Sequence, residues 1–249
     1  MPVVIDLSIQ YIMISISNII HKAWFPRVFP FILFIAFIAL ESLIDFLSQY
    51  YTPLVKVAEY DSYIFYPVKT VLVAVALLLL WNRYTEIDIK KGLSVKNLLI
   101  GFFSGAAVFV LWINMDMKFA TLKEPESYNP FIFANSFFFY LIISFRLFGS
   151  SVVVPVCEEL FWRSFVLRYI INPKFEDVPV GKFTWISFVI ASIFFGLEHN
   201  LWLAGIMAGV SYSLILYYTR SLIVAIFSHG ITNLLLGIYV IKTGNWQFW

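Results

Sequence analysis

The sequence contains several runs of about twenty residues that carry almost no charged side chain, long enough to cross a lipid bilayer as a helix. Residues 28–40 and 221–241 contain no Asp, Glu, Lys or Arg at all. Lipid cannot hydrogen-bond the backbone, so a spanning segment must be a helix or part of a closed barrel. The whole chain is 61% hydrophobic and only 13% charged, with a mean hydropathy of +0.86. These values predict an integral membrane protein.

We expect an all-α, polytopic membrane protein of about eight transmembrane helices. The chain should form a single domain, 1–249, with N-terminal helices in 1–149 and a catalytic core in 150–241. Residues 1–20 suit a helix that lies in the membrane interface. The links near Asn200 and Arg220 are very short, which predicts tight antiparallel hairpins. The expected spans are 28–48, 64–81, 98–115, 131–148, 150–171, 183–199, 201–219 and 221–241, and 49–63 is expected to be a polar connection.

Composition also excludes other classes of protein. The 17 basic and 15 acidic residues give a net charge of +2 without a basic stripe, which argues against nucleic-acid binding. The single cysteine, Cys157, cannot form an intrachain disulfide. A nucleophilic role for Cys157 is disfavoured, because no general base lies near it in the sequence.

The first group of ionisable residues at membrane depth is Cys157-Glu158-Glu159-Leu160-Phe161-Trp162-Arg163. Each such residue costs about 2.5–3.5 kcal/mol on insertion scales, so it normally faces a partner or a wet cavity. Glu159 and Arg163 are four residues apart and can pair on one helix face. Glu158 points about 100° away from Glu159 and has no partner within the helix. An ordinary charged helix end at the interface would show the same pattern.

Two further groups lie in the apolar segments that follow. Phe195 and His199 end one helix, and Glu198 precedes the histidine. His229 and Asn233 share a face in the middle of the uncharged run 221–241. A lone membrane histidine is usually a packing residue, but the carboxylate, two imidazoles and an amide in consecutive helices together predict a hydrolytic site.

The expected chemistry needs no serine or cysteine nucleophile. Glu158 and His199 hold a water, and the carboxylate takes its proton as it attacks a peptide carbonyl. His229 and Asn233 stabilise the oxyanion. Glu159 with Arg163 fixes the catalytic helix. We therefore expect the helices to enclose a hydrophilic catalytic cavity, with Glu198 and Phe195 as possible lining residues.

These motifs resemble the CPBP family of intramembrane proteases, which includes CAAX proteases and bacteriocin-processing (Abi) enzymes. The family pattern EExxxR, FxxxH and HxxxN is matched by Glu158, Glu159 and Arg163, by Phe195 and His199, and by His229 and Asn233. The resemblance implies a glutamic-type endopeptidase with these residues in the roles given above. Its substrate would be a membrane-associated protein or peptide, with the lipid bilayer as surroundings. The segments VPVCEELFWRSF, FGLEH and SHGITN further resemble a bacterial CAAX prenyl protease-related branch that accompanies exosortase systems, which implies the bacterial cytoplasmic membrane.

The sequence leaves two alternatives open. The same site could be a zinc protease, with Glu158, His199 and His229 as ligands, although no HExxH motif is present and the expected mechanism needs no cofactor. The chain could instead be a non-enzymatic binding or accessory protein. Outside the motifs, Glu41 and Asp45 share one face of the first span and could line the cavity or pair with Lys69.

Overall fold

The computed structural model describes residues 17–92, 94–122, 128–134 and 136–248, and these form helices without a strand. Most of the interfacial helix predicted for residues 1–20 therefore lies outside the described residues. The elements that position the site are α2 (Phe25–Ser48), α3 (Thr52–Leu79), α4 (Ile89–Gly92), α5 (Val95–Trp112), α6 (Phe137–Phe148), η4 (Gly149–Val153), α7 (Val154–Glu159), η5 (Leu160–Val166), α8 (Leu167–Ile171), α9 (Trp185–Leu197), α10 (Trp202–Thr219) and α11 (Leu222–Thr243). Short helical turns lie at Trp81–Arg83, Lys118–Ala120, Pro130–Phe133, Phe175–Asp177 and Trp246–Phe248.

Among the described residues, six helices are long and apolar enough to cross a membrane, and the shorter apolar α9 lies beside them. The all-α polytopic class is confirmed, but the expected count of eight is too high. The segments 131–148 and 150–171 were predicted as two spans, whereas Phe137–Ile171 is one helix of 35 residues. The intervening Gly149, Ser150 and Ser151 belong to a π-helical turn that continues the helix.

The predicted polar connection 49–63 is also wrong over most of its length. Helix α3 begins at Thr52, with a proline in its first turn, and runs for 28 residues. Pro53 suits that position because its fixed φ and missing N–H do not oppose a helix start. The polar residues that suggested a loop lie in the first turns of α3. This helix is longer than is needed to cross about 30 Å of hydrocarbon.

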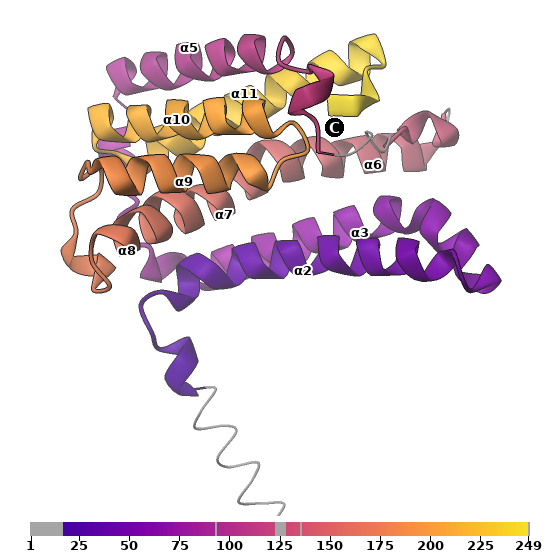
Figure 1. Cartoon of the computed structure of the whole chain (residues 1–249), viewed down its shortest axis with the longest axis horizontal. Helices are drawn as coiled ribbons and strands as arrows, with labels where there is room; N and C mark the ends of the chain where they lie inside the picture. Colours follow the sequence, from indigo (N-terminus) through magenta and orange to yellow (C-terminus); the bar gives the residue numbers. More distant parts are fainter. Residues whose placement is uncertain (1–16, 93, 123–127, 135, 249) are drawn as a thin grey trace, which may run out of the picture.

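The helices form two groups (Figure 1). Helices α2 and α3 pack as a pair, while α9, α10, α11 and α5 lie side by side, with α7 and α8 between the two groups. Only four residues separate α9 from α10, and two separate α10 from α11, where Arg220 adopts a left-handed conformation with φ of 53°. The tight antiparallel hairpins are confirmed.

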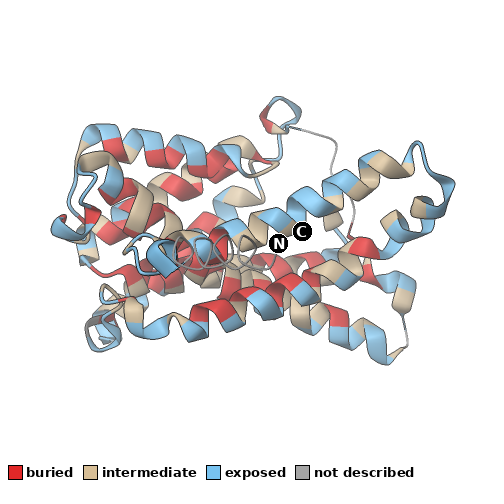
Figure 2. Ribbon diagram, turned by 90° about the horizontal axis from the view of Figure 1, so that it is seen from below, coloured by how far each residue is buried: buried red, intermediate tan, exposed pale blue. Residues whose placement is uncertain are grey.

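The outer helix faces are apolar as well as exposed. Figure 2 shows exposed residues along the outer faces of most helices and buried residues where the helices meet. Leu79, Phe103 and Phe137 have 79%, 65% and 75% of their surface exposed. Water would penalise such surfaces, and lipid does not. The protein is therefore an integral membrane protein.

The long helix Phe137–Ile171 departs from α-helical geometry twice, at η4 and again at η5. Pro155 lies just after η4 and has no N–H to give to the carbonyl four residues earlier. A π-turn accommodates such an interruption by adding a residue to the turn, and π-turns are frequent at functional sites. Glu158 and Glu159 of the EExxxR motif lie in α7, between the two π-turns, and Arg163 lies within the second π-turn.

A buried polar cluster ties α2 to this long helix. The Arg27 guanidinium contacts the Glu86 carboxylate at 2.5 Å and donates to the carbonyls of Ala23 and Arg83. Ser164 donates its hydroxyl hydrogen to the same carboxylate, one residue after Arg163. Next to this cluster, the Phe31 and Phe161 rings stack with centroids 4.0 Å apart. The N-terminal helix pair is thus docked directly against the segment that carries the acidic motif.

Candidate active site

Glu159 and Arg163 form the ion pair that their spacing predicts. The Glu159 Oε1 atom lies 3.2 Å from Arg163 Nη1, and both side chains are buried. Arg163 also donates to the Gly209 carbonyl at 3.1 Å and lies 4.2 Å from the centroid of the Phe195 ring. These contacts fix the guanidinium between α7, α9 and α10.

Glu159 makes a second contact that sequence spacing could not show. Its Oε1 atom lies 3.1 Å from His229 Nδ1, 70 residues further along the chain. A carboxylate paired with an arginine is an acceptor, so His229 Nδ1–H is the donor. The Tyr212 ring stacks on the imidazole with centroids 4.6 Å apart. Glu159 therefore orients His229, whose Nε2 atom faces the opposite way.

Glu158 lies on the other side of that imidazole. Its Oε2 atom is 3.9 Å from His229 Nε2, and only 7% of the residue is exposed. Within the described part of the chain, this oxygen has no hydrogen-bond partner. Leaving a buried carboxylate oxygen unbonded costs free energy, so the site suits a water or a substrate group at that position.

His199 is oriented by the helix end on which it lies. Its Nδ1 atom is 2.7 Å from the Phe195 carbonyl oxygen, which is among the last acceptors of α9. A carbonyl only accepts, so Nδ1 carries the proton, and the neutral ring keeps a lone pair on Nε2. This contact gives the FxxxH spacing a physical reason: the histidine caps the carbonyl four residues before it.

Phe195 and Glu198 support the same region. The Phe195 ring is 4.9 Å from the His199 ring and 6.0 Å from the His229 ring, measured between centroids, so it lies near both imidazoles. The Glu198 carboxylate accepts a hydrogen bond of 3.0 Å from the Trp162 indole. Glu158, Glu198 and His199 offer ligand atoms that all lie within 4.8 Å of one another.

Asn233 lies one turn after His229 on α11. Its Nδ2 atom donates to the Ser150 carbonyl at 2.8 Å, within the π-turn η4. The bond joins α11 to the long helix at this π-turn. It uses one of the two amide hydrogens, and the second remains available for another acceptor.

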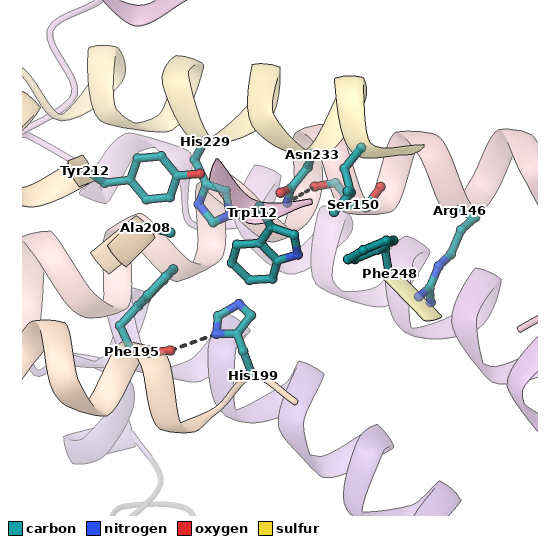
Figure 3. Close-up of a pocket in the computed structure, with 11 residues that line it drawn as sticks. Trp112, Arg146, Ser150, Phe195, His199, Ala208, Tyr212, His229, Asn233 and Phe248 are labelled. Carbon is teal, nitrogen blue, oxygen red and sulfur yellow. Dashed lines mark hydrogen bonds between the residues drawn. The ribbon is translucent and has the colours of Figure 1, made fainter. Parts of the chain in front are cut away.

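These side chains meet at a cavity of about 160 Å³. Figure 3 shows Phe195 and His199 on one wall and Tyr212, His229 and Asn233 on the opposite wall. Arg146, Ser150 and Phe248 lie at one end, and the Trp112 ring lies near His199, with centroids 5.5 Å apart. Glu158 is not among the described residues that line the cavity, but its carboxylate lies 3.9 Å from His229 Nε2 and within 4.8 Å of a His199 ring nitrogen. The structure therefore brings together all four residues for which the sequence predicts a catalytic role, from α7, from the link that follows α9, and from α11.

A comparison with protein families identifies the segment that contains this site. The model of the family described as "Type II CAAX prenyl endopeptidase Rce1-like" matches residues 140–235. We call this matched segment, residues 140–235, the Rce1-like domain. The matched segment includes every predicted site residue, and the resemblance to CAAX proteases is confirmed. No curated protein and no solved structure gave a match.

Sequence reasoning missed several side chains of the Rce1-like domain and its neighbours. Tyr212, Trp112 and Phe248 line the cavity, but aromatic residues in apolar helices carry no spacing signal. Arg146 could have been found, because an arginine within the apolar run 131–148 is costly. Glu41, by contrast, pairs with Lys69 at 3.1 Å and is not among the residues that line the cavity. Of the two roles proposed for Glu41, pairing with Lys69 is the one observed.

Cys157 is fully buried in the Rce1-like domain, and its thiol donates to the Val154 carbonyl. It packs in the apolar cluster formed with Leu160, Leu216 and Leu222, away from the residues that line the cavity. This position gives it a packing role.

Proposed function

We propose that the chain is an intramembrane endopeptidase that hydrolyses a peptide bond in a membrane-associated protein, with a water activated by Glu158 and His199. The match of residues 140–235 to an Rce1-like family supports peptidase activity in general. The observation that carries the specific proposal is the pair of oriented imidazoles beside the unbonded oxygen of Glu158. The bacterial cytoplasmic membrane as the location, and a link to exosortase systems, remain expectations from the sequence.

The first step is attack by water. His199 accepts one water hydrogen at Nε2, and Glu158 takes the other proton as the water oxygen bonds to the peptide carbonyl carbon. The tautomer of His199 suits this role, since Nδ1–H is held by the Phe195 carbonyl. The product of this step is a tetrahedral intermediate with a negatively charged oxygen.

The oxyanion needs donors that are already in place. His229 directs its Nδ1–H at Glu159, so it presents Nε2–H to the cavity when it is doubly protonated. Glu159, whose charge Arg163 balances, holds the ring in that orientation. The second amide hydrogen of Asn233 is the other donor. The C–N bond then breaks, and the proton on Glu158 passes to the leaving nitrogen. The products are an amine and a carboxylic acid, and the acid gives its proton to the amine or to water.

A zinc-dependent mechanism is the second candidate, favoured by one observation. Glu158, Glu198 and His199 could each supply one ligand atom, which leaves a fourth position open, as in catalytic zinc sites. His229, which the sequence-based alternative included, is outside this group. The 2.7 Å bond from His199 Nδ1 to a carbonyl is also typical of a zinc-bound histidine.

One experiment separates these candidates. The purified protein in detergent micelles is given a library of N-terminally palmitoylated peptides with random C-terminal segments, and products are identified by mass spectrometry. Wild type is compared with Glu158→Gln, His199→Asn and the matched control Glu176→Gln, whose side chain is exposed. We expect Glu158→Gln to lose on the order of 10²–10⁴-fold in rate, while Glu176→Gln cleaves normally.

Equal cleavage by all variants would refute the proposal. Inhibition by 1,10-phenanthroline, reversed by added Zn²⁺, would favour the metal mechanism. If the folded wild-type protein cleaves nothing, the accessory role gains support.

A further inference from the structure

Arg146 is a charged residue within the apolar helix α6, in the candidate span Phe137–Ile171. Its guanidinium carbon lies 4.2 Å from the centroid of the Tyr66 ring and 4.7 Å from that of Tyr128. Cation–π contacts at such distances stabilise the side chain where water is scarce. An arginine at membrane depth normally faces a polar partner or a wet cavity.

The side chain of Arg146 lines the cavity that contains both imidazoles. Figure 3 shows its guanidinium at the end near Phe248, while His199 and His229 lie further along. Among the described residues that line the cavity, it is the only arginine or lysine. Arg146 lies outside the EExxxR, FxxxH and HxxxN motifs, and the proposed hydrolysis does not use it.

Arg146 and the neighbouring buried cations Arg163 and Lys69 all interact with other residues of the chain. Arg163 is held by Glu159 at 3.2 Å, and Lys69 by Glu41 at 3.1 Å. Carboxylates gather at the reacting end, where Glu158 and Glu198 lie close together. Acidic groups therefore lie beside His199 at one end of the cavity, and a guanidinium lines the other end. That polarity would orient a substrate that carries a negative charge.

We propose that Arg146 binds a carboxylate of the substrate and thereby sets which peptide bond reaches Glu158. This inference rests on the proposed function. The carboxylate is either the C-terminal one or an Asp or Glu side chain near the cleaved bond. Arg146 also has other interactions within the chain, and its five N–H donors can serve several partners at once. The planar fork fits a carboxylate through two parallel hydrogen bonds.

The test neutralises the charge on each side of the contact. Three matched libraries of N-terminally palmitoylated peptides share the same random C-terminal segments. The first has a free C-terminal carboxylate, the second a C-terminal amide, and the third Asn and Gln in place of Asp and Glu. Each is given to wild type, Arg146→Gln, Arg146→Lys and the control Arg83→Gln, whose guanidinium binds backbone carbonyls outside the cavity.

For wild type and Arg83→Gln, we expect one of the two neutralisations to lower kcat/KM on the order of 10- to 100-fold, as for loss of a charged hydrogen bond. With the charged peptides, Arg146→Gln should have a kcat/KM that is lower than that of the wild type by the same factor, mainly because KM is higher. This variant should cleave the charged and neutralised libraries equally well. Arg146→Lys should retain part of the preference. The library that causes the loss tells which carboxylate is bound.

Two results would overturn the inference. One is wild-type cleavage that depends on Glu158 but is indifferent to both neutralisations, a comparison that needs no variant at position 146. The other is an unchanged preference in Arg146→Gln. A complete absence of Glu158-dependent cleavage would overturn the proposed function as well, so the two failures are distinguishable.

Discussion

Replacing Glu159 by glutamine should destabilise the protein strongly, because the substitution leaves a buried arginine without its counter-charge. Glu159 is fully buried, and its Oε1 atom is shared by Arg163 at 3.2 Å and His229 at 3.1 Å. Removing one partner of a buried ion pair costs about 3–5 kcal/mol. Arg163 cannot lose its proton to relieve the cost. We therefore expect Glu159→Gln to lower the free energy of unfolding by about this amount.

The double variant Glu159→Gln with Arg163→Met tests the cause. The double variant should lose less unfolding free energy than the two single variants lose in sum. For residues in contact, this difference reaches about 3 kcal/mol. Some loss should remain, because Arg163 also donates to the Gly209 carbonyl and packs on Phe195.

The assay is unfolding by sodium dodecyl sulfate in mixed micelles, followed by fluorescence of the 8 tryptophans. Glu41→Gln is the matched control. Its side chain is 18% exposed, and its partner Lys69 can give up a proton when buried, so a smaller loss is expected. The reasoning would be refuted if the losses of unfolding free energy from Glu159→Gln and Arg163→Met were strictly additive. It would also be refuted if Glu41→Gln lost more unfolding free energy than Glu159→Gln.

Three further predictions use other parts of the structure. Burial raises the pKa of the Glu86 carboxyl, but the hydrogen bonds from Arg27 and Ser164 and the positive charge of Arg27 outweigh burial and lower this pKa below 4.5. The free energy of unfolding that Glu86 contributes is therefore complete above pH 4.5 and is lost as the pH falls through the lowered pKa. When unfolding is measured against pH, Glu86→Gln should not show this loss of stability at acid pH. Gly205→Ala places a Cβ 2.9 Å from the Gly196 backbone, so the same assay should show a loss of about 1–3 kcal/mol. Cys157→Ala should retain peptidase activity, and a wild-type activity that thiol reagents abolish, with Cys157→Ala resistant to them, would contradict the buried packing role.

The fold was largely predictable from hydropathy, because each apolar run in the catalytic half became a helix. Hydropathy did not show that Gly149, Ser150 and Ser151 continue a helix, since small polar residues also mark loops. It also missed the start of α3, where charged residues follow Pro53 within a helix. Both errors arise because tertiary contacts, such as the bond from Asn233 to the Ser150 carbonyl, stabilise segments that local patterns leave ambiguous.

The site was predictable in its residues but not in all of its contacts. Local spacing shows which side chains share a helix face, so the pair of Glu159 with Arg163 was expected. The contact from Glu159 to His229 joins helices far apart in sequence, and nothing local signals it. Tyr212, which stacks on His229, is likewise an aromatic residue in an apolar helix.

The most direct test of the central claim is the rate of peptide cleavage by Glu158→Gln, measured as kcat/KM on a peptide that the wild type cleaves. The variant keeps the shape of the side chain but cannot accept the water proton. We predict a loss on the order of 10²–10⁴-fold with an unchanged unfolding free energy. A folded Glu158→Gln protein that cleaves within about tenfold of the wild-type rate would contradict water activation by this carboxylate.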